Sequence, residues 1–394
     1  MDRATQSDDV LTRAHSVGDL LKAAAPRIEA ANSLPEDVVA ALHGAGLFRL
    51  LLPQSVGGDE LDLKTFAEVM QVIASFDAST AWTISQGAGC AMSAAWLGPA
   101  TAQRLFGPAN AVLAWGAGIQ GKAIKVNGGY RVSGKWAFAS GSGHATLLGG
   151  HSFVFEADGT TPATKPDGSR RDRTMLFAAD KATFHDVWNV MGLRGTASNT
   201  FEVADLFVPE DETLDRNNEA ERRESGGLYR CTTSLAYGVG FSALQLGIAR
   251  AMLDELLALA MTKTPRAAPS SLRADPVFQT LLAENEAQYR SARAYLHAAA
   301  SEADAIAATR STSLLRADRV NLKLATVHVI QKAIEITLAA YRAAGASAIF
   351  PSGPFERRFR DAMTASQQVQ ARSTNYIIAG RCLLDLEPDP AMSL

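Results

Sequence analysis

The chain has 394 residues, 47% of them hydrophobic and 20% charged, with a formal net charge of −3. This composition is typical of a globular protein of two or three domains, and the charge gives no sign of a nucleic-acid or membrane partner. The three cysteines and seven histidines have no metal-ligand spacing, so we expect no metal site. No apolar run reaches bilayer length and no signal-peptide pattern opens the chain, so we expect a cytoplasmic protein.

The first part of the chain has the periodicity of helices. We expect no regular structure in the ten polar residues at the start, and helices from residue 10 to about residue 107. One of these helices begins near Asp77, with Ser79 or Thr80 as candidate N-caps.

The middle of the chain changes to short strands. Residues 123–126 and 130–132 flank Asn127-Gly128-Gly129, a hairpin signal because asparagine and glycine tolerate positive φ. The polar run 159–173 contains two prolines and a cluster of arginines, and we expect it to be an exposed loop.

Helical periodicity returns after a linker and continues to the end. Residues 238–259, 276–308, 313–344 and 356–384 are expected to form four long antiparallel helices, with alanine-rich seams that allow tight packing. No GxGxxG follows a strand, so a Rossmann nicotinamide site is not supported.

The stretch 188–209, WNVMGLRGTASNTFEVADLFVP, lies between the strand-like and helical parts. Its two glycines let a backbone approach a ligand closely, and Arg194 with the following hydroxyls offers hydrogen-bond donors. By itself the pattern also suits an ordinary strand–loop–strand.

This stretch resembles the middle-domain signature of the acyl-CoA dehydrogenase superfamily, and more closely that of its flavin-dependent monooxygenase branch, similar to the oxygenase component of p-hydroxyphenylacetate hydroxylase. Further signatures of that branch are matched in order by GKWAFASG at 134–141 with His144-Ala145, by Arg266 with Phe278-Gln279, and by FRDA at 359–362 with Ser366-Gln367. The resemblance implies an α+β fold: an N-terminal helical domain (1–110), a central β domain (111–216) and a C-terminal four-helix bundle (217–394).

The resemblance also implies a flavin site, for which the chain offers aromatic, hydroxyl and guanidinium groups. The candidates are Trp115, Trp136, Phe138 and Trp188 for the ring slot, Ser140, Ser142 and Thr196 as donors to the ring, and Arg194, Ser198 and Arg266 (from a neighbouring subunit) for the phosphate. Any one of the aromatic residues alone would more often be a core residue.

A catalytic base is missing where the dehydrogenases of the superfamily have one. The two positions fall on Met363 and on Tyr237-Gly238, which offer no base near neutral pH. Many oxygenases have two histidines in the terminal helix, and this chain has Met363 and Gln368 instead. His144 is the remaining histidine beside the expected flavin edge, and a structural role weighs equally there; His151 and His328 are expected to be structural.

The resemblance therefore predicts an oxygenase component that uses reduced FMN, or FAD, from a separate flavin reductase, with O2 and a small aromatic or heteroatom-containing substrate. Ser140, His144 and Gln368 are the catalytic candidates, and a homotetramer is expected. The alternatives are an acyl-CoA dehydrogenase-like enzyme with a displaced base, and a non-catalytic flavin-binding paralogue.

Overall fold

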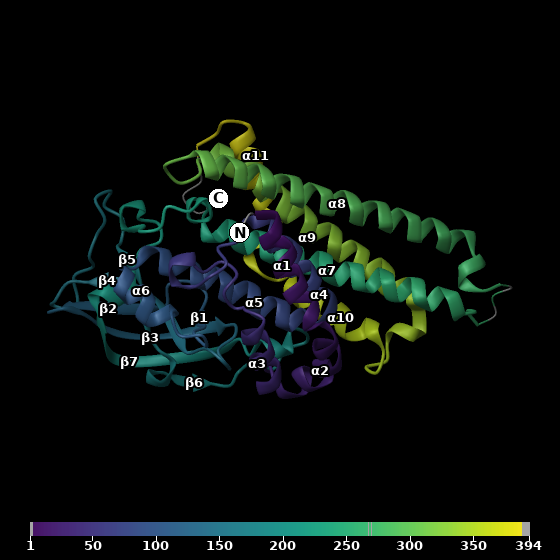
Figure 1. Ribbon diagram of the computed structural model, residues 1–394, viewed down its shortest axis with the longest axis horizontal. Coiled ribbons are helices and arrows are strands. Elements are labelled where there is room, and N and C mark those ends of the chain that lie inside the picture. Colours follow the sequence, from purple (N-terminus) through teal and green to yellow (C-terminus); the bar gives the residue numbers. More distant parts are fainter. Residues whose placement is uncertain (1–2, 267, 269, 388–394) are drawn as a thin grey trace.

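A β sheet from the middle of the chain lies at one end of the molecule, and helices from both terminal parts pack together beside it (Figure 1). The computed structural model describes residues 3–266, 268 and 270–387. The predicted α+β fold, with a helical N-terminal part, a central sheet and a helical C-terminal part, is confirmed.

Six helices precede the sheet: α1 (Arg3–Ser16), α2 (Gly18–Ala31), α3 (Glu36–Gly44), α4 (Leu63–Phe76), α5 (Ala78–Ala91) and α6 (Pro99–Phe106). The expectation of an irregular start is wrong for residues 3–10, which begin α1, a helix with a buried face at Val10 and Ala14. Residues 1–2 lie outside the described residues. The expectation of Ser79 or Thr80 as the cap of α5 is wrong. The N-cap is Asp77, whose side chain accepts a hydrogen bond from Thr80 N.

The sheet contains eight strands: β1 (Leu113–Trp115), β2 (Gly121–Val126), β3 (Gly129–Ala139), β4 (Leu147–Phe155), β5 (Asp172–Ala178), β6 (Thr183–His185), β7 (Asn199–Pro209) and β8 (Thr213–Leu214). Their order is β6-β7-β3-β2-β4-β5-β8, with β1 beside β4. The predicted hairpin joins β2 to β3, and Gly128 at its turn has a φ of 78°. In the described part of the chain, no helix has the length and apolarity needed to span a bilayer.

In the C-terminal part, the described residues form three long helices, α7 (Thr233–Thr262), α8 (Pro276–Thr309) and α9 (Arg316–Ala344), and two short ones, α10 (Pro354–Ala365) and α11 (Thr374–Leu383). The prediction of one long helix over 356–384 is wrong. Polar side chains satisfy the backbone at the break: Ser366 Oγ donates to the Met363 carbonyl, and Gln368 Oε1 accepts from Gln370 N. Such local bonds compete with helix continuation.

The N-terminal and C-terminal helices share one hydrophobic core. Helix α4 packs so closely on α7 that a Cβ at Gly247 would lie 2.5 Å from the Gln71 carbonyl oxygen. The sheet has its own smaller core around Trp136. Helix α5 contacts both α7 and β1, so it connects the bundle to the sheet.

Candidate active site

Three residues other than glycine have positive φ at the end of β3 and in the loop that leads into β7. Phe138, near the end of β3, has a φ of 62°, and Leu193 and Ala197, which flank the 3-10 turn Arg194–Thr196, have φ of 54° and 44°. The left-handed conformation costs such residues about 1–2 kcal/mol each. Strain of this kind is typical of ligand-binding segments, so the loop 193–197 with the end of β3 is the first candidate site.

Hydroxyl groups form a hydrogen-bonded chain beneath this loop. Thr196 Oγ1 donates to the Leu193 carbonyl at 2.9 Å and lies 2.7 Å from Ser198 Oγ, which lies 2.7 Å from Ser140 Oγ. Trp82 Nε1 donates to Ser140 Oγ at 3.0 Å. Each hydroxyl has one proton, and that of Thr196 goes to the Leu193 carbonyl. Ser198 therefore donates to Thr196, and Ser140, which accepts from Trp82, donates to Ser198. We call these groups the hydroxyl chain.

An aromatic pair, of which Phe138 is exposed and Trp188 half-buried, lies beside the hydroxyl chain. The Phe138 side chain is 63% exposed, and its ring meets that of Trp188 edge to face with the centroids 6.2 Å apart. Trp188 Nε1 donates to the Leu193 carbonyl at 3.0 Å, where the hydroxyl chain ends. The pair therefore presents apolar ring surface two residues from Ser140.

A carboxylate of α10 holds the loop from the other side. Asp361 Oδ1 accepts from Leu193 N at 2.6 Å, and Asp361 is 4% exposed. Burial, together with the negative charge of Asp77, raises the pKa of Asp361 to about 7 although the Leu193 amide opposes this shift. A Cβ at Gly192 would collide with the Arg360 carbonyl, which explains why glycine lies there.

Stacked rings connect the hydroxyl chain to the interior. Trp82 stacks on Phe241 with the centroids 4.1 Å apart, and Phe241 stacks on Tyr237 at 5.8 Å. Tyr237 is buried beside Cys90 and Arg216, and burial raises the pKa of its hydroxyl. We call Trp82, Phe241 and Tyr237 the aromatic column; Ser140 lies at one end of it and Arg216 at the other.

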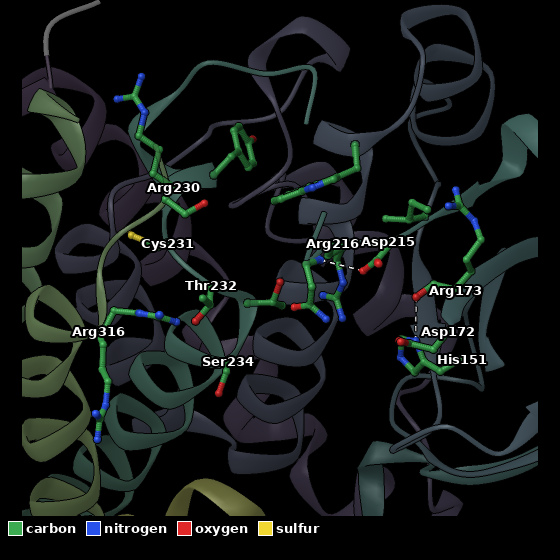
Figure 2. Close-up of a pocket in the computed structure, with 18 of the residues that line it drawn as sticks. His151, Asp172, Arg173, Asp215, Arg216, Arg230, Cys231, Thr232, Ser234 and Arg316 are labelled. Atoms are coloured by element: carbon green, nitrogen blue, oxygen red, sulfur yellow. Dashed lines mark hydrogen bonds between the residues drawn. The ribbon is translucent and has the colours of Figure 1, made fainter. Parts of the chain in front are cut away.

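A cavity of about 680 Å³ lies at the Arg216 end, between β4, β5 and the first turns of α7 and α9. Figure 2 shows Arg216 in its middle, with His151 and Arg173 on one side and Thr232, Ser234 and Arg316 on the other. The Arg216 guanidinium lies 4.1 Å from the centre of the Trp115 ring, which is 4.8 Å from the His151 ring. Burial, with the charge of Arg216, lowers the pKa of His151 to about 3. The cavity has the size of small-molecule sites.

The structure brings most of the predicted flavin ligands together. Phe138, Ser140, Thr196 and Ser198 meet at the loop, and Ser142 Oγ donates to the Ala197 carbonyl at 2.7 Å. Arg194 is part of the loop, but its Nε donates to Asn32 Oδ1. The other three candidates lie elsewhere. Trp136 is fully buried between Phe201 and Phe177 in the sheet core, Trp115 adjoins the cavity, and Arg266 is exposed in the loop after α7.

The two remaining catalytic candidates have unpartnered nitrogens. His144 packs on Phe48 with the ring centroids 5.1 Å apart, its Nε2 is buried without a hydrogen bond, and burial with nearby His43 lowers its pKa to about 4. It is therefore neutral at pH 7. Gln368 Nε2 is likewise buried without a partner, and its Oε1 accepts from Gln370 N.

Several site residues were missed from the sequence. The exposed loop predicted for 159–173 is wrong at its end, because Arg173 lies in β5, is 7% exposed and pairs with Glu221 at 2.8 Å. Arg216 had no local signal. Asp361 belongs to the FRDA motif, but its bond to the Leu193 amide, 168 residues away, could not be read from that motif. Among the described residues, no group of three or more His, Cys, Asp or Glu side chains is arranged to hold a metal ion.

The residues at the loop fit a flavin. The ring of a flavin needs a flat apolar surface with polar groups at its rim, and Phe138 with Trp188 offers the first beside Ser140, which offers the second. The strained loop backbone and the unpartnered His144 Nε2, four residues beyond Ser140, are further features of a segment built for a ligand.

Two family models match the chain. "Acyl-CoA dehydrogenase, N-terminal domain" matches residues 15–106, and "Acyl-CoA dehydrogenase, C-terminal domain" matches residues 239–372. Together the two matches span more than half of the chain. The chain belongs to the acyl-CoA dehydrogenase family.

Relatives in this family are named as monooxygenases. The chain is 29% identical to indole-3-acetate monooxygenase of Pseudomonas putida over 363 residues, which is 91% of this chain and 89% of the relative. It is 34% identical over 198 residues, 49% of each chain, to the flavin-dependent monooxygenase oxygenase subunit HsaA of Rhodococcus jostii. XiaF from Streptomyces sp., solved with FADH2 and glycerol, has the same fold, with a TM-score of 0.91 and 24% identity over 100% of this chain and 98% of that one.

Proposed function

We propose that this chain is the oxygenase component of a two-component monooxygenase, which uses reduced flavin and O2 to oxygenate a small aromatic compound. The pair of exposed Phe138 and half-buried Trp188 beside the hydroxyl chain is the observation that carries the proposal. The chain's relatives, an indole-3-acetate monooxygenase and an oxygenase subunit, support the proposal. Met363 and Tyr237-Gly238, at the positions of the dehydrogenase base, argue against acyl-CoA dehydrogenation.

In this proposal, the chain's own residues bind the flavin and orient its ring. Phe138 and Trp188 hold the flavin ring, and Ser140, fixed by Trp82 and Ser198, presents its hydroxyl at the rim. A bound reduced flavin would supply the chemistry that activates O2. His144 stays neutral at pH 7 and offers a nitrogen that no protein group occupies, and Gln368 Nε2 is a free donor for substrate.

The partners follow from the same proposal. The cofactor is FMN or FAD, reduced by a separate reductase, since the relatives include an oxygenase subunit. We assign the chain to a cytoplasmic homotetramer, in which Arg266 of each subunit reaches a neighbour's flavin. Three free cysteines, two of them buried, support a reducing compartment.

Replacing Phe138 tests the flavin surface. Phe138→Ala should weaken binding of reduced FMN about tenfold, because an aromatic stacking contact is worth about 1 kcal/mol or more. It should not lower the melting temperature, since the side chain is 63% exposed. Phe207→Ala is the matched control, because Phe207 is another exposed phenylalanine of the sheet, 43% exposed and stacked on Arg131.

Anaerobic fluorescence titration of reduced FMN measures the affinities, and product analysis with O2 and indole-3-acetate measures the reaction. Equal loss of affinity in Phe138→Ala and Phe207→Ala would remove the pair from the flavin site. A protein that purifies with tightly bound oxidised FAD and desaturates an acyl-CoA would contradict the oxygenase function. Flavin binding without any oxygenated product from a panel of aromatic compounds would favour a non-catalytic paralogue.

A further inference from the structure

The cavity beside Trp115 has more positive than negative charge. Six arginines and two aspartates line it. The aspartates, Asp172 and Asp215, both face Lys165, at 2.8 and 3.7 Å, and Arg173 pairs with Glu221. Within the described residues, no carboxylate forms an ion pair with four of the other arginines: Arg216, Arg230, Arg316 and Arg381. The lining therefore has more guanidinium groups than carboxylates, although the charge of Asp215 acts on Arg216.

The buried unpartnered polar atoms of the lining are all donors. They are Trp96 Nε1, Arg216 Nη1 and Arg230 Nε, and Trp96 is only 7% exposed. A buried donor left without an acceptor costs about 1–3 kcal/mol. The shared chemistry of these atoms points to a ligand with acceptor oxygens.

A helix terminus adds donors from another direction. Thr233 and Ser234, in the first turn of the 30-residue helix α7, line the cavity. Amides in the first turn of a helix have no acceptor within the helix, and the helix dipole gives that end a partial positive charge. Trp96, His151 and Tyr229 provide ring surface on the same lining, so the cavity combines cationic and aromatic walls.

We propose that this cavity binds the carboxylate of an aromatic carboxylic acid, which is the substrate of the reaction proposed above, with Arg216 as the main anion-binding residue. Arg216 lies over the Trp115 ring at 4.1 Å and is next to Tyr237. A carboxylate on Arg216 would leave the attached ring within reach of Trp96, His151 and Tyr229, the aromatic residues of the lining. Guanidinium groups match carboxylates with two parallel hydrogen bonds.

Matched acid and amide pairs test this assignment. The probes are benzoate, phenylacetate and indole-3-acetate, each with its uncharged amide, and calorimetry measures their dissociation constants on the full-length protein without flavin. At least one acid should bind about tenfold or more tightly than its amide, because hydrogen bonds to charged groups are roughly twice as strong as neutral ones. Arg216→Met should abolish that preference, and Arg216→Lys should restore part of it.

Two further variants make the result decisive. Arg290→Gln, on the exposed face of α8 with a side chain 76% exposed, is the control and should leave the preference unchanged. Arg316→Gln should reduce it, and this variant replaces Arg216→Met if the latter does not fold. No preference for any acid, or a preference unchanged in both cavity variants, overturns the proposal. The proposal is also overturned if Arg216→Met binds FMN more weakly but keeps the preference for the acid, because the cavity would then hold the flavin phosphate. The acids are titrated without flavin, so a failure to bind them is distinct from a failure to form oxygenated product.

Discussion

The carboxylate of Asp361 is held in a place that disfavours its charge. Its pKa is raised from the ordinary 3.8 to about 7, so between about pH 4 and pH 7 the unfolded chain releases a proton that the folded chain keeps. The stability that this group contributes is therefore fully present below about pH 4 and is lost as the pH rises to about 7. Wild-type protein should lose stability over that window for this reason.

Asp361→Asn tests the effect directly. Asparagine keeps an oxygen for the Leu193 amide and cannot ionise. The melting temperature of the variant minus that of the wild type should rise from about pH 4 to about pH 7 and then stay level. A difference that does not change with pH would show that Asp361 is ionised in the folded protein throughout.

Single residues were predictable where local sequence placed them. Ser140, Thr196 and Ser198 were chosen from two motifs, and the structure joins them in one hydroxyl chain; flavin binding by them stays a prediction. Trp136 was chosen from the same motif, but it points to the core face of β3. The pairing of Arg173 with Glu221, 48 residues away, could not be read from spacing.

At the scale of elements, Asp77 is the N-cap of α5, and its negative charge also acts on the buried Asp361. Asp77 Oδ1 accepts from Thr80 N at 2.7 Å and from Thr80 Oγ1 at 2.8 Å. Asp77→Ala should lower the free energy of unfolding by about 1–2 kcal/mol, the upper range for loss of an N-cap. Asp77→Asn keeps a good cap and removes the negative charge near Asp361.

Urea unfolding of both variants at several pH values measures the two effects. Asp77→Asn should retain most of the stability, and its pH-dependent loss should move to lower pH because the pKa of Asp361 falls. Equal destabilisation by alanine and asparagine would mean that the charge of Asp77, and not its capping bond, supports the helix.

Helix and strand types were predicted from periodicity, and the helix ends were not. The fourth predicted helix breaks because Ser366 and Gln368 bond to nearby backbone, a competition that apolar spacing does not report. The early start of α1 was missed because its first turn is polar on all sides in the sequence, and only the packing of Val10 and Ala14 shows its buried face.

At the scale of the whole molecule, Arg266 is a candidate flavin ligand only in an oligomer. It is exposed at the end of α7, in a loop at the tip of the bundle away from the sheet (Figure 1). Light scattering should give a mass four times that of the 41.8 kDa chain. Arg266→Ala should weaken FMN binding without lowering the melting temperature, and Arg273→Ala, another exposed arginine of the same connection, should have no effect. A monomeric protein would remove Arg266 from the site.

The bond between Asp361 and the Leu193 amide makes the loop 193–197 dependent on a helix residue 168 positions further along the chain. The loop therefore cannot be transferred to another protein by itself with its conformation retained. A chimaera that takes its central domain from a relative would inherit the strained loop without the anchor that holds it, unless α10 is exchanged at the same time. Recombination within this family should accordingly succeed more often when crossover points keep these two segments from the same parent.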